Sequence, residues 1–91
     1  MKQLRASLNI RGRVQGVFFR QSTRETATSY GLTGWVRNHP NGSVDAVVEG
    51  PELAVRQVIA WCRQGPAAAR VDEVTVDWHP ATGEFTDFTI R

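Results

Sequence analysis

The sequence predicts an α+β fold in which two helices cover one face of an antiparallel sheet. Two observations carry this prediction: several segments alternate apolar and polar residues with a period of two, and two segments repeat apolar residues at helical spacing. Glycine- and proline-containing turns separate these segments in the order β-α-β-β-α-β, and a further short strand follows. That order defines the ferredoxin-like sandwich.

The N-terminal half is expected to supply a strand, a helix and a hairpin. Alternation over residues 4–10 predicts a half-buried strand. A helix is expected over residues 21–30, with Thr23 and Tyr30 as packing positions, because the glycine that follows residue 30 suits the end of a helix. Residues 32–38 and 43–49 are expected to pair across a His-Pro-Asn-Gly turn, whose proline presets φ and whose Asn-Gly pair tolerates positive φ.

The C-terminal half is expected to supply a helix and two strands. The helix starts at Gly50-Pro51-Glu52, because proline at the first helical position costs no hydrogen bond and an early acid suits the helix dipole. It ends at Gly65, and alternation over residues 71–78 then predicts the fourth strand, followed by a short closing strand over residues 85–91. The apolar stripe of the helix is Leu53, Ala54, Val58, Trp61 and Cys62, and the core is expected to take in Trp35, Trp61 and Trp78.

Several classes of protein are excluded by residue counts. The single cysteine, Cys62, cannot form an internal disulfide, and it is expected to be a buried, unreactive thiol. His39 and His79 lie far apart with no nearby ligand partner, so no metal and no cofactor are predicted. No apolar stretch approaches the roughly 20 residues that span a bilayer, and the N-terminus lacks the apolar segment of a signal peptide. A cytoplasmic location and no membrane partner are expected.

Charge is unevenly distributed along the chain. Residues 1–37 carry seven basic groups and one acid, whereas residues 38–91 carry four basic groups and eight acids. Ten of the eleven basic residues are arginine, whose planar fork suits carboxylate and phosphate groups. The N-terminal third is therefore expected to meet an anionic partner. Arg5, Arg11 and Arg24 are expected to be solvated.

The segment between the first strand and the first helix has the composition of an anion cradle. Gly12 and Gly16 allow the backbone to turn its N–H groups into one concavity, and Arg20 stands where the helix begins. The first N–H groups of a helix are unpaired and its dipole is positive there, which favours an anion. We expect the backbone amides of residues 15–20 (Gln15, Gly16, Val17, Phe18, Phe19 and Arg20) to bind a phosphate or carboxylate together with the Arg20 side chain.

Two motifs in this chain resemble the signatures of the acylphosphatase family. Residues 12–20 (GRVQGVFFR) resemble the first signature. The run from Gly34 to Asn38 (GWVRN), followed by Gly42-Ser43-Val44 and Glu49-Gly50, resembles the second. The resemblance extends over essentially the whole chain, as one domain of residues 1–91, and two long motifs at the expected separation are far more specific than a single glycine pattern.

The resemblance implies hydrolysis of acyl phosphates to a carboxylate and inorganic phosphate. It implies that Arg20 holds the phosphoryl group with the loop amides and that Asn38 positions the attacking water. The expected partners are a small acyl phosphate and, as product or inhibitor, inorganic phosphate or a similar anion. A monomer that binds no nucleic acid is expected.

Two other interpretations remain open from the sequence. One is a non-catalytic module of the same fold that binds an anion or RNA, although the aromatic sheet motif of RNA readers is absent. The other is an accessory domain, because acylphosphatase-like domains also head larger hydrogenase-maturation carbamoyltransferases. The first and last residues of the chain favour a free-standing protein.

Overall fold

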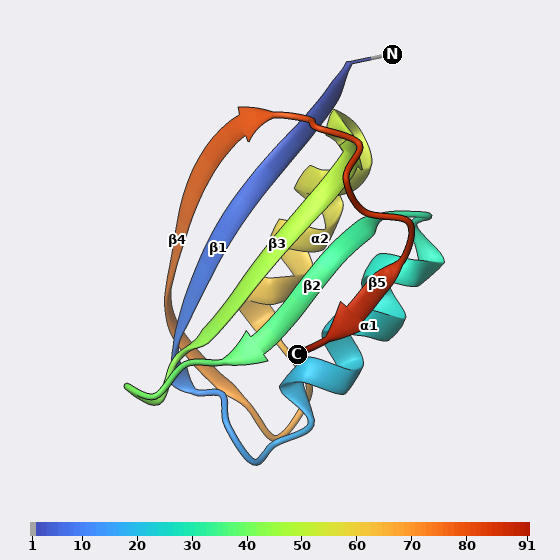
Figure 1. Cartoon of the computed structure of the whole chain (residues 1–91). Coiled ribbons are helices and arrows are strands. Elements are labelled where there is room, and N and C mark those ends of the chain that lie inside the picture. Colours follow the sequence, from blue (N-terminus) through green and yellow to red (C-terminus); the bar gives the residue numbers. More distant parts are fainter. Residues whose placement is uncertain (1) are drawn as a thin grey trace.

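A computed structural model describes residues 2–91, which form one five-stranded sheet covered on one face by two helices (Figure 1). The strands lie in the order β4-β1-β3-β2-β5. The elements are β1 (Gln3–Arg13), α1 (Phe19–Ser29), β2 (Thr33–Asn38), β3 (Val44–Pro51), α2 (Glu52–Gln64), β4 (Arg70–Pro80) and β5 (Phe88–Ile90). The predicted fold class is confirmed, with one difference: β5 pairs with β2 in parallel, so the sheet is mixed.

The alternating segments place their apolar residues under the helices as predicted. In β1, Ala6, Leu8 and Ile10 are buried, and in β3 Val44 and Val48 are buried beside them. The intervening β1 residues lie on the other face of the sheet, because successive side chains of a strand point to opposite faces. The predicted hairpin is confirmed by the antiparallel pairing of β2 with β3.

Some element boundaries differ from the prediction. Helix α1 begins at Phe19 rather than Gln21, because Phe18 adopts a left-handed conformation that ends the loop directly before it. Pro51 is the last residue of β3 and precedes α2 instead of occupying its first turn. Strand β5 covers only Phe88–Ile90, since the preceding segment is held by side-chain contacts rather than by strand pairing.

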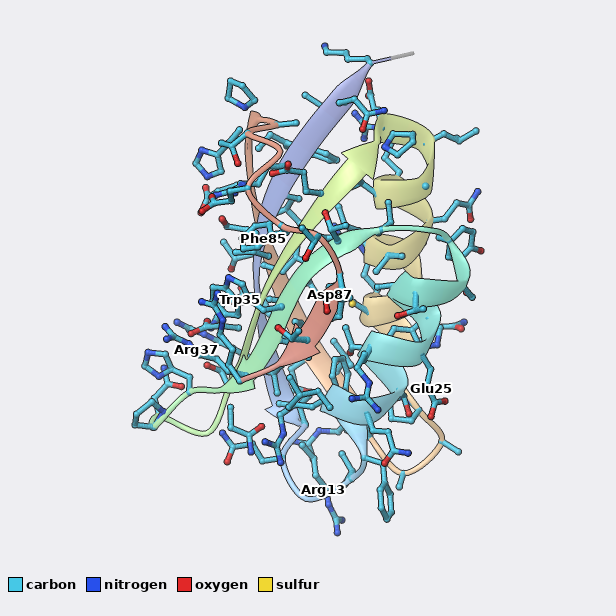
Figure 2. The ribbon with its side chains drawn as sticks, turned by 45° about the vertical axis from the view of Figure 1, so that its right-hand side comes forward. Arg13, Glu25, Trp35, Arg37, Phe85 and Asp87 are labelled. Carbon is cyan, nitrogen blue, oxygen red and sulfur yellow. The ribbon has the colours of Figure 1, made fainter. Side chains whose placement is uncertain are left out.

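Several residues expected in the core lie at the surface. Tyr30 and Leu53 are exposed, and Trp78 is exposed on the edge strand β4, where Arg56 stacks on its ring at 4.8 Å. Trp35 lies half-buried on the face of the sheet that the helices leave open, close to Arg37 (Figure 2). The buried side of α2 consists of Val55, Val58, Ile59 and Cys62. Of the predicted apolar stripe, Val58 and Cys62 are therefore buried and Ala54 and Trp61 pack against the core, whereas Leu53 faces solvent.

The connections that carry the two sequence motifs meet at one end of the sheet. The β1–α1 loop, the β2–β3 turn and the α2–β4 loop all lie at the lower end in Figure 1. The pairing of β1 with β4 shifts register between Arg11 and Gly12. A Cβ atom on Gly12 would lie 2.1 Å from the carbonyl oxygen of Arg70, so glycine is required where β1 leads into the loop.

No helix among residues 2–91 has the length and apolar character needed to cross a membrane.

Candidate active site

A cavity of about 340 Å³ lies where the β1–α1 loop approaches the end of β2. Both residues proposed for catalysis, Arg20 and Asn38, line it, although they belong to different sequence motifs. The other residues that line the cavity are Val14, Gly16, Phe18, Phe19, Gln21 and Ile90. The structure therefore brings the two sequence motifs together around one cavity.

The β1–α1 loop is fixed by alternate anchoring of its side chains. Val14, Val17 and Phe19 are buried in the core, whereas Gly16 and Phe18 face outward. The Phe19 ring packs on Trp61 of α2 with ring centroids 5.5 Å apart, which fixes the beginning of α1 against α2. These anchors hold the intervening backbone in place without using its polar groups.

Backbone N–H groups of the loop and of the first turn of α1 are free to bind a ligand. Within residues 2–91, none of the N–H groups of residues 15–20 donates a hydrogen bond, and the first helical bond runs from the Ser22 N–H to the Phe18 carbonyl at 3.0 Å. No side chain caps α1 and no acidic residue lies in its first turn. Unpaired N–H groups at a helix N-terminus favour an anion, and nothing in the first turn neutralises them.

Left-handed backbone geometry shapes the loop at two positions. Gly16 has φ of 75° and Phe18 has φ of 64°. Glycine adopts this conformation readily, whereas a bulky residue does so at a cost of about 1–3 kcal/mol. Phe18 is the one residue other than glycine with positive φ among residues 2–91.

Arg20 is a half-buried residue whose guanidinium has no partner among residues 2–91. Among residues 2–91 its side chain makes no hydrogen bond and no ion pair. Two other arginines near the loop differ from it: Arg37 lies 3.6 Å from a carboxylate oxygen of Asp45, and Arg13 is exposed and points away from the sheet (Figure 2). Arg20 is thus the cavity-lining cation, and its donors are available to a ligand.

Asn38 ends β2 opposite Val44, and its side-chain oxygen lacks a partner. The Oδ1 atom is buried and accepts no hydrogen bond from any residue in the part of the chain that the structure describes. A buried unpaired acceptor is costly, which makes it informative where it lines a cavity. This oxygen is suited to accept a hydrogen bond from a water molecule.

The Gln15 side chain bonds to the β2–β3 turn, a contact that the sequence did not predict. Its side-chain Nε2 donates to the carbonyl oxygens of His39 and Ser43, at 2.8 and 2.9 Å. These bonds tie the loop to the turn that directly follows Asn38. Of the six residues predicted to bind phosphate, Gly16, Phe18, Phe19 and Arg20 line the cavity, whereas Gln15 and Val17 do not. Gln15 and Val17 can contribute to an anion site only through their backbone N–H groups.

Other chemically interesting groups lie outside this site. Cys62 is fully buried in α2, and burial raises the pKa of its thiol to about 12, so it stays protonated at neutral pH as expected. No cluster of three or more His, Cys, Asp or Glu side chains suited to a metal ion occurs among residues 2–91.

Comparison with known proteins decides the family. A family model described as Acylphosphatase matches residues 6–90, nearly the whole chain. The chain belongs to the acylphosphatase family. An acylphosphatase of Pyrobaculum islandicum is 57% identical over 91 residues, which cover 99% of this chain and 96% of that protein. The predictions of family and enzyme class are therefore confirmed.

Solved acylphosphatase structures share this fold. The crystal structure of the Bacillus subtilis acylphosphatase superposes with a TM-score of 0.93 at 31% identity, covering 97% of this chain and 98% of that one. Full-length HypF, in its phosphate- and nucleotide-bound form, contains a region with a TM-score of 0.89 at 32% identity. That region takes in 99% of this chain but only 12% of HypF, so the same fold also occurs within a longer protein.

Proposed function

We propose that this chain hydrolyses acyl phosphates as a single acylphosphatase domain, by attack of water on the phosphorus atom. The observation that carries the proposal is one cavity lined by both Arg20, whose side chain makes no hydrogen bond or ion pair among residues 2–91, and Asn38, whose buried Oδ1 has no partner there. Arg20 and the N–H groups of residues 15–20 bind the phosphoryl oxygens. Asn38 accepts a hydrogen bond from the attacking water and orients it toward phosphorus.

The reaction matches what these groups can supply. Water forms a bond to phosphorus while the bond from phosphorus to the acyl oxygen breaks, and the products are a carboxylate and dihydrogen phosphate. The conjugate acid of the leaving carboxylate has a pKa near 4, so no general acid is needed at neutral pH. Phosphoryl transfer through a loose transition state depends mainly on positioning and charge stabilisation, and the loop amides with Arg20 provide both.

Asn38 positions the water but cannot act as a base. Its amide oxygen has no useful basicity, so the proton released by the water passes to a phosphate oxygen of the substrate or to solvent. This assignment predicts that no single carboxylate or histidine controls the pH–rate profile. A titrating group that disappears when one such residue is replaced would contradict it.

An RNA-binding role has less support from the described surface. The aromatic residue on the open face of β2, Trp35, already stacks with Arg37 and Arg91, whose guanidinium carbons lie 5.0 and 4.8 Å from its ring centroid. Bases bind sheets of this kind by stacking on aromatic side chains that are free to receive them. The acyl phosphate reaction is therefore the function that the site supports best.

The proposal is tested by hydrolysis of benzoyl phosphate with EDTA present. We expect release of benzoate and inorganic phosphate at a rate that EDTA does not change, since the loop amides and Arg20 supply the charge. No hydrolysis by the unmodified protein would overturn the proposed function. A rate that falls with EDTA and returns with added metal would overturn the mechanism while leaving the reaction itself.

A further inference from the structure

Phe18 combines two features that do not favour folding. Its side chain is 76% exposed, more than that of any other large apolar residue described, and its backbone has the left-handed φ of 64°. Exposure forfeits the burial energy of a phenyl ring, and positive φ is unfavourable for a bulky side chain. Strained, exposed residues of this kind tend to occur at ligand sites.

The position of Phe18 relates it to the proposed substrate. Its residue lines the same cavity as Arg20 and Asn38, and it directly precedes the first turn of α1. Its N–H group, like the others of residues 15–20, donates no hydrogen bond among residues 2–91, and its side chain stays outside the core. A phosphoryl group bound by these amides would therefore have an apolar ring at the edge of its site.

In-line attack determines where the acyl group of the substrate must go. The leaving carboxylate departs on the side of phosphorus opposite the water, and Asn38 holds that water in the proposed mechanism. The acyl group therefore extends away from Asn38. Among the remaining apolar lining residues, Val14 and Phe19 are buried in the core and Ile90 lies on β5 beside the strand that carries Asn38. Phe18 is the apolar lining residue with a largely exposed side chain.

We propose that Phe18 is a specificity residue that contacts the acyl group and favours aryl and other bulky apolar acyl phosphates over small or charged ones. The inference rests on the proposed function and names its substrate class. Burial of the ring against an aromatic acyl group recovers part of the apolar contact that the free protein lacks, and aromatic pairs add to this through their preferred geometries. Acetyl phosphate offers only one methyl group for the same contact.

The test is the ratio of kcat/KM for benzoyl phosphate to kcat/KM for acetyl phosphate. Phe18→Asn removes the ring, and asparagine tolerates the left-handed conformation. Phe18→Tyr keeps the ring and is the matched control. We expect the ratio to fall about fivefold or more in Phe18→Asn and to stay within about twofold of the original in Phe18→Tyr. The ratio is the readout because damage to the phosphate-binding loop lowers kcat/KM for both substrates by the same factor.

Each outcome of this experiment decides something. An unchanged ratio in Phe18→Asn, or an equal fall in both variants, would overturn the specificity role while leaving the proposed function intact. A fall in kcat/KM by the same factor for both substrates would assign Phe18 to the geometry of the cradle alone and also overturn it. Failure of the unmodified protein to hydrolyse either substrate would overturn the proposed function, and this inference with it.

Discussion

Arg5 lies near the start of β1 and Arg20 in the first turn of α1, and these two segments lie at opposite ends of the molecule (Figure 1). The surroundings of the two arginines differ. The Arg5 side chain donates to Glu49 at 2.9 Å, pairs with Glu84, and stacks over the Phe85 ring at 4.8 Å. Arg20 has no hydrogen bond or ion pair among residues 2–91. Both belong to the basic N-terminal third, so the sequence alone presents them as similar charges.

The two arginines differ in what their side chains contact. Arg5 fixes the segment before β5 to the sheet, because its partner Glu49 also accepts a hydrogen bond from the Gly83 N–H at 2.6 Å. Arg5 Nε and Nη2 therefore both donate to protein acceptors. At the other end, neither the Arg20 side chain nor Asn38 Oδ1 has a hydrogen-bond partner among residues 2–91. The first arrangement stabilises the fold, and the second is suited to a substrate.

The largest effect is expected from Arg20→Ala. Removal of the cavity's guanidinium should lower kcat for benzoyl phosphate by at least about 10³-fold, because the developing charge on the phosphoryl group loses its side-chain donor. The free energy of unfolding should change by less than about 0.5 kcal/mol, since no protein contact is lost. Steady-state kinetics and urea denaturation measure the two quantities.

Arg24→Ala is the matched control, since Arg24 lies one turn further along α1 and does not line the cavity. It should retain kcat within about twofold. Comparable losses in the two variants would show that net charge, and not the position of Arg20, determines activity.

A similar loss is expected from Asn38→Ala, with a different distribution between the kinetic constants. We expect kcat to fall by about 10²- to 10³-fold and KM to change little, because Asn38 contacts the water and not the phosphoryl group. Inorganic phosphate should inhibit the variant and the original protein to the same extent. Full activity in Asn38→Ala would remove this residue from the mechanism.

A smaller effect, on stability alone, is expected from Glu49→Gln. Glu49 is 5% exposed and its partner Arg5 18%, so loss of the ion pair should cost about 2 kcal/mol of unfolding free energy. Activity measured well below the unfolding temperature should stay within about twofold. A large loss of kcat in this variant would show that Glu49 affects the active site as well as stability, and would contradict the division of roles between the two arginines.

The same carboxylate predicts how stability depends on pH. Burial by itself raises the pKa of Glu49, but hydrogen bonds from Arg5, Gly83 and Thr82 outweigh burial and hold the pKa below its usual value. The carboxylate therefore contributes stability above the unfolded-state pKa of about 4.3, and this contribution is lost as pH falls through the lower folded-state pKa. Denaturation at pH 7 and pH 3 should show a smaller pH-dependent loss in Glu49→Gln than in the original protein.

Local patterns in the sequence predicted most of the fold. Alternation in β1 and β3 identified their buried faces, and Gly31 correctly follows the end of α1. Which apolar residues of α2 and of the edge strand β4 are buried was harder to predict. Leu53 and Trp78 are apolar, yet no neighbouring element covers them and both are exposed. Apolar character shows what can be buried, whereas the packing of neighbouring elements decides what is buried.

The candidate site was predicted in part. The loop glycines and the position of Arg20 at the start of α1 indicate an anion site by local chemistry, whereas the proposed role of Asn38 came only from resemblance to a family. Contacts over long sequence separations could not be predicted, because nothing local signals that Gln15 bonds to a turn 28 residues away or that Arg5 reaches Glu84 across 79 residues. The same is true of the missing partner of Asn38 Oδ1.

The central claim is that water held by Asn38 attacks the phosphorus atom of a phosphoryl group held by Arg20 and the loop amides. Single-turnover hydrolysis of benzoyl phosphate in ¹⁸O-labelled water tests it most directly. The account predicts that the label enters inorganic phosphate and that benzoate stays unlabelled, because the bond that breaks joins phosphorus to the acyl oxygen. Label in benzoate would show attack at the carbonyl carbon and would contradict the account.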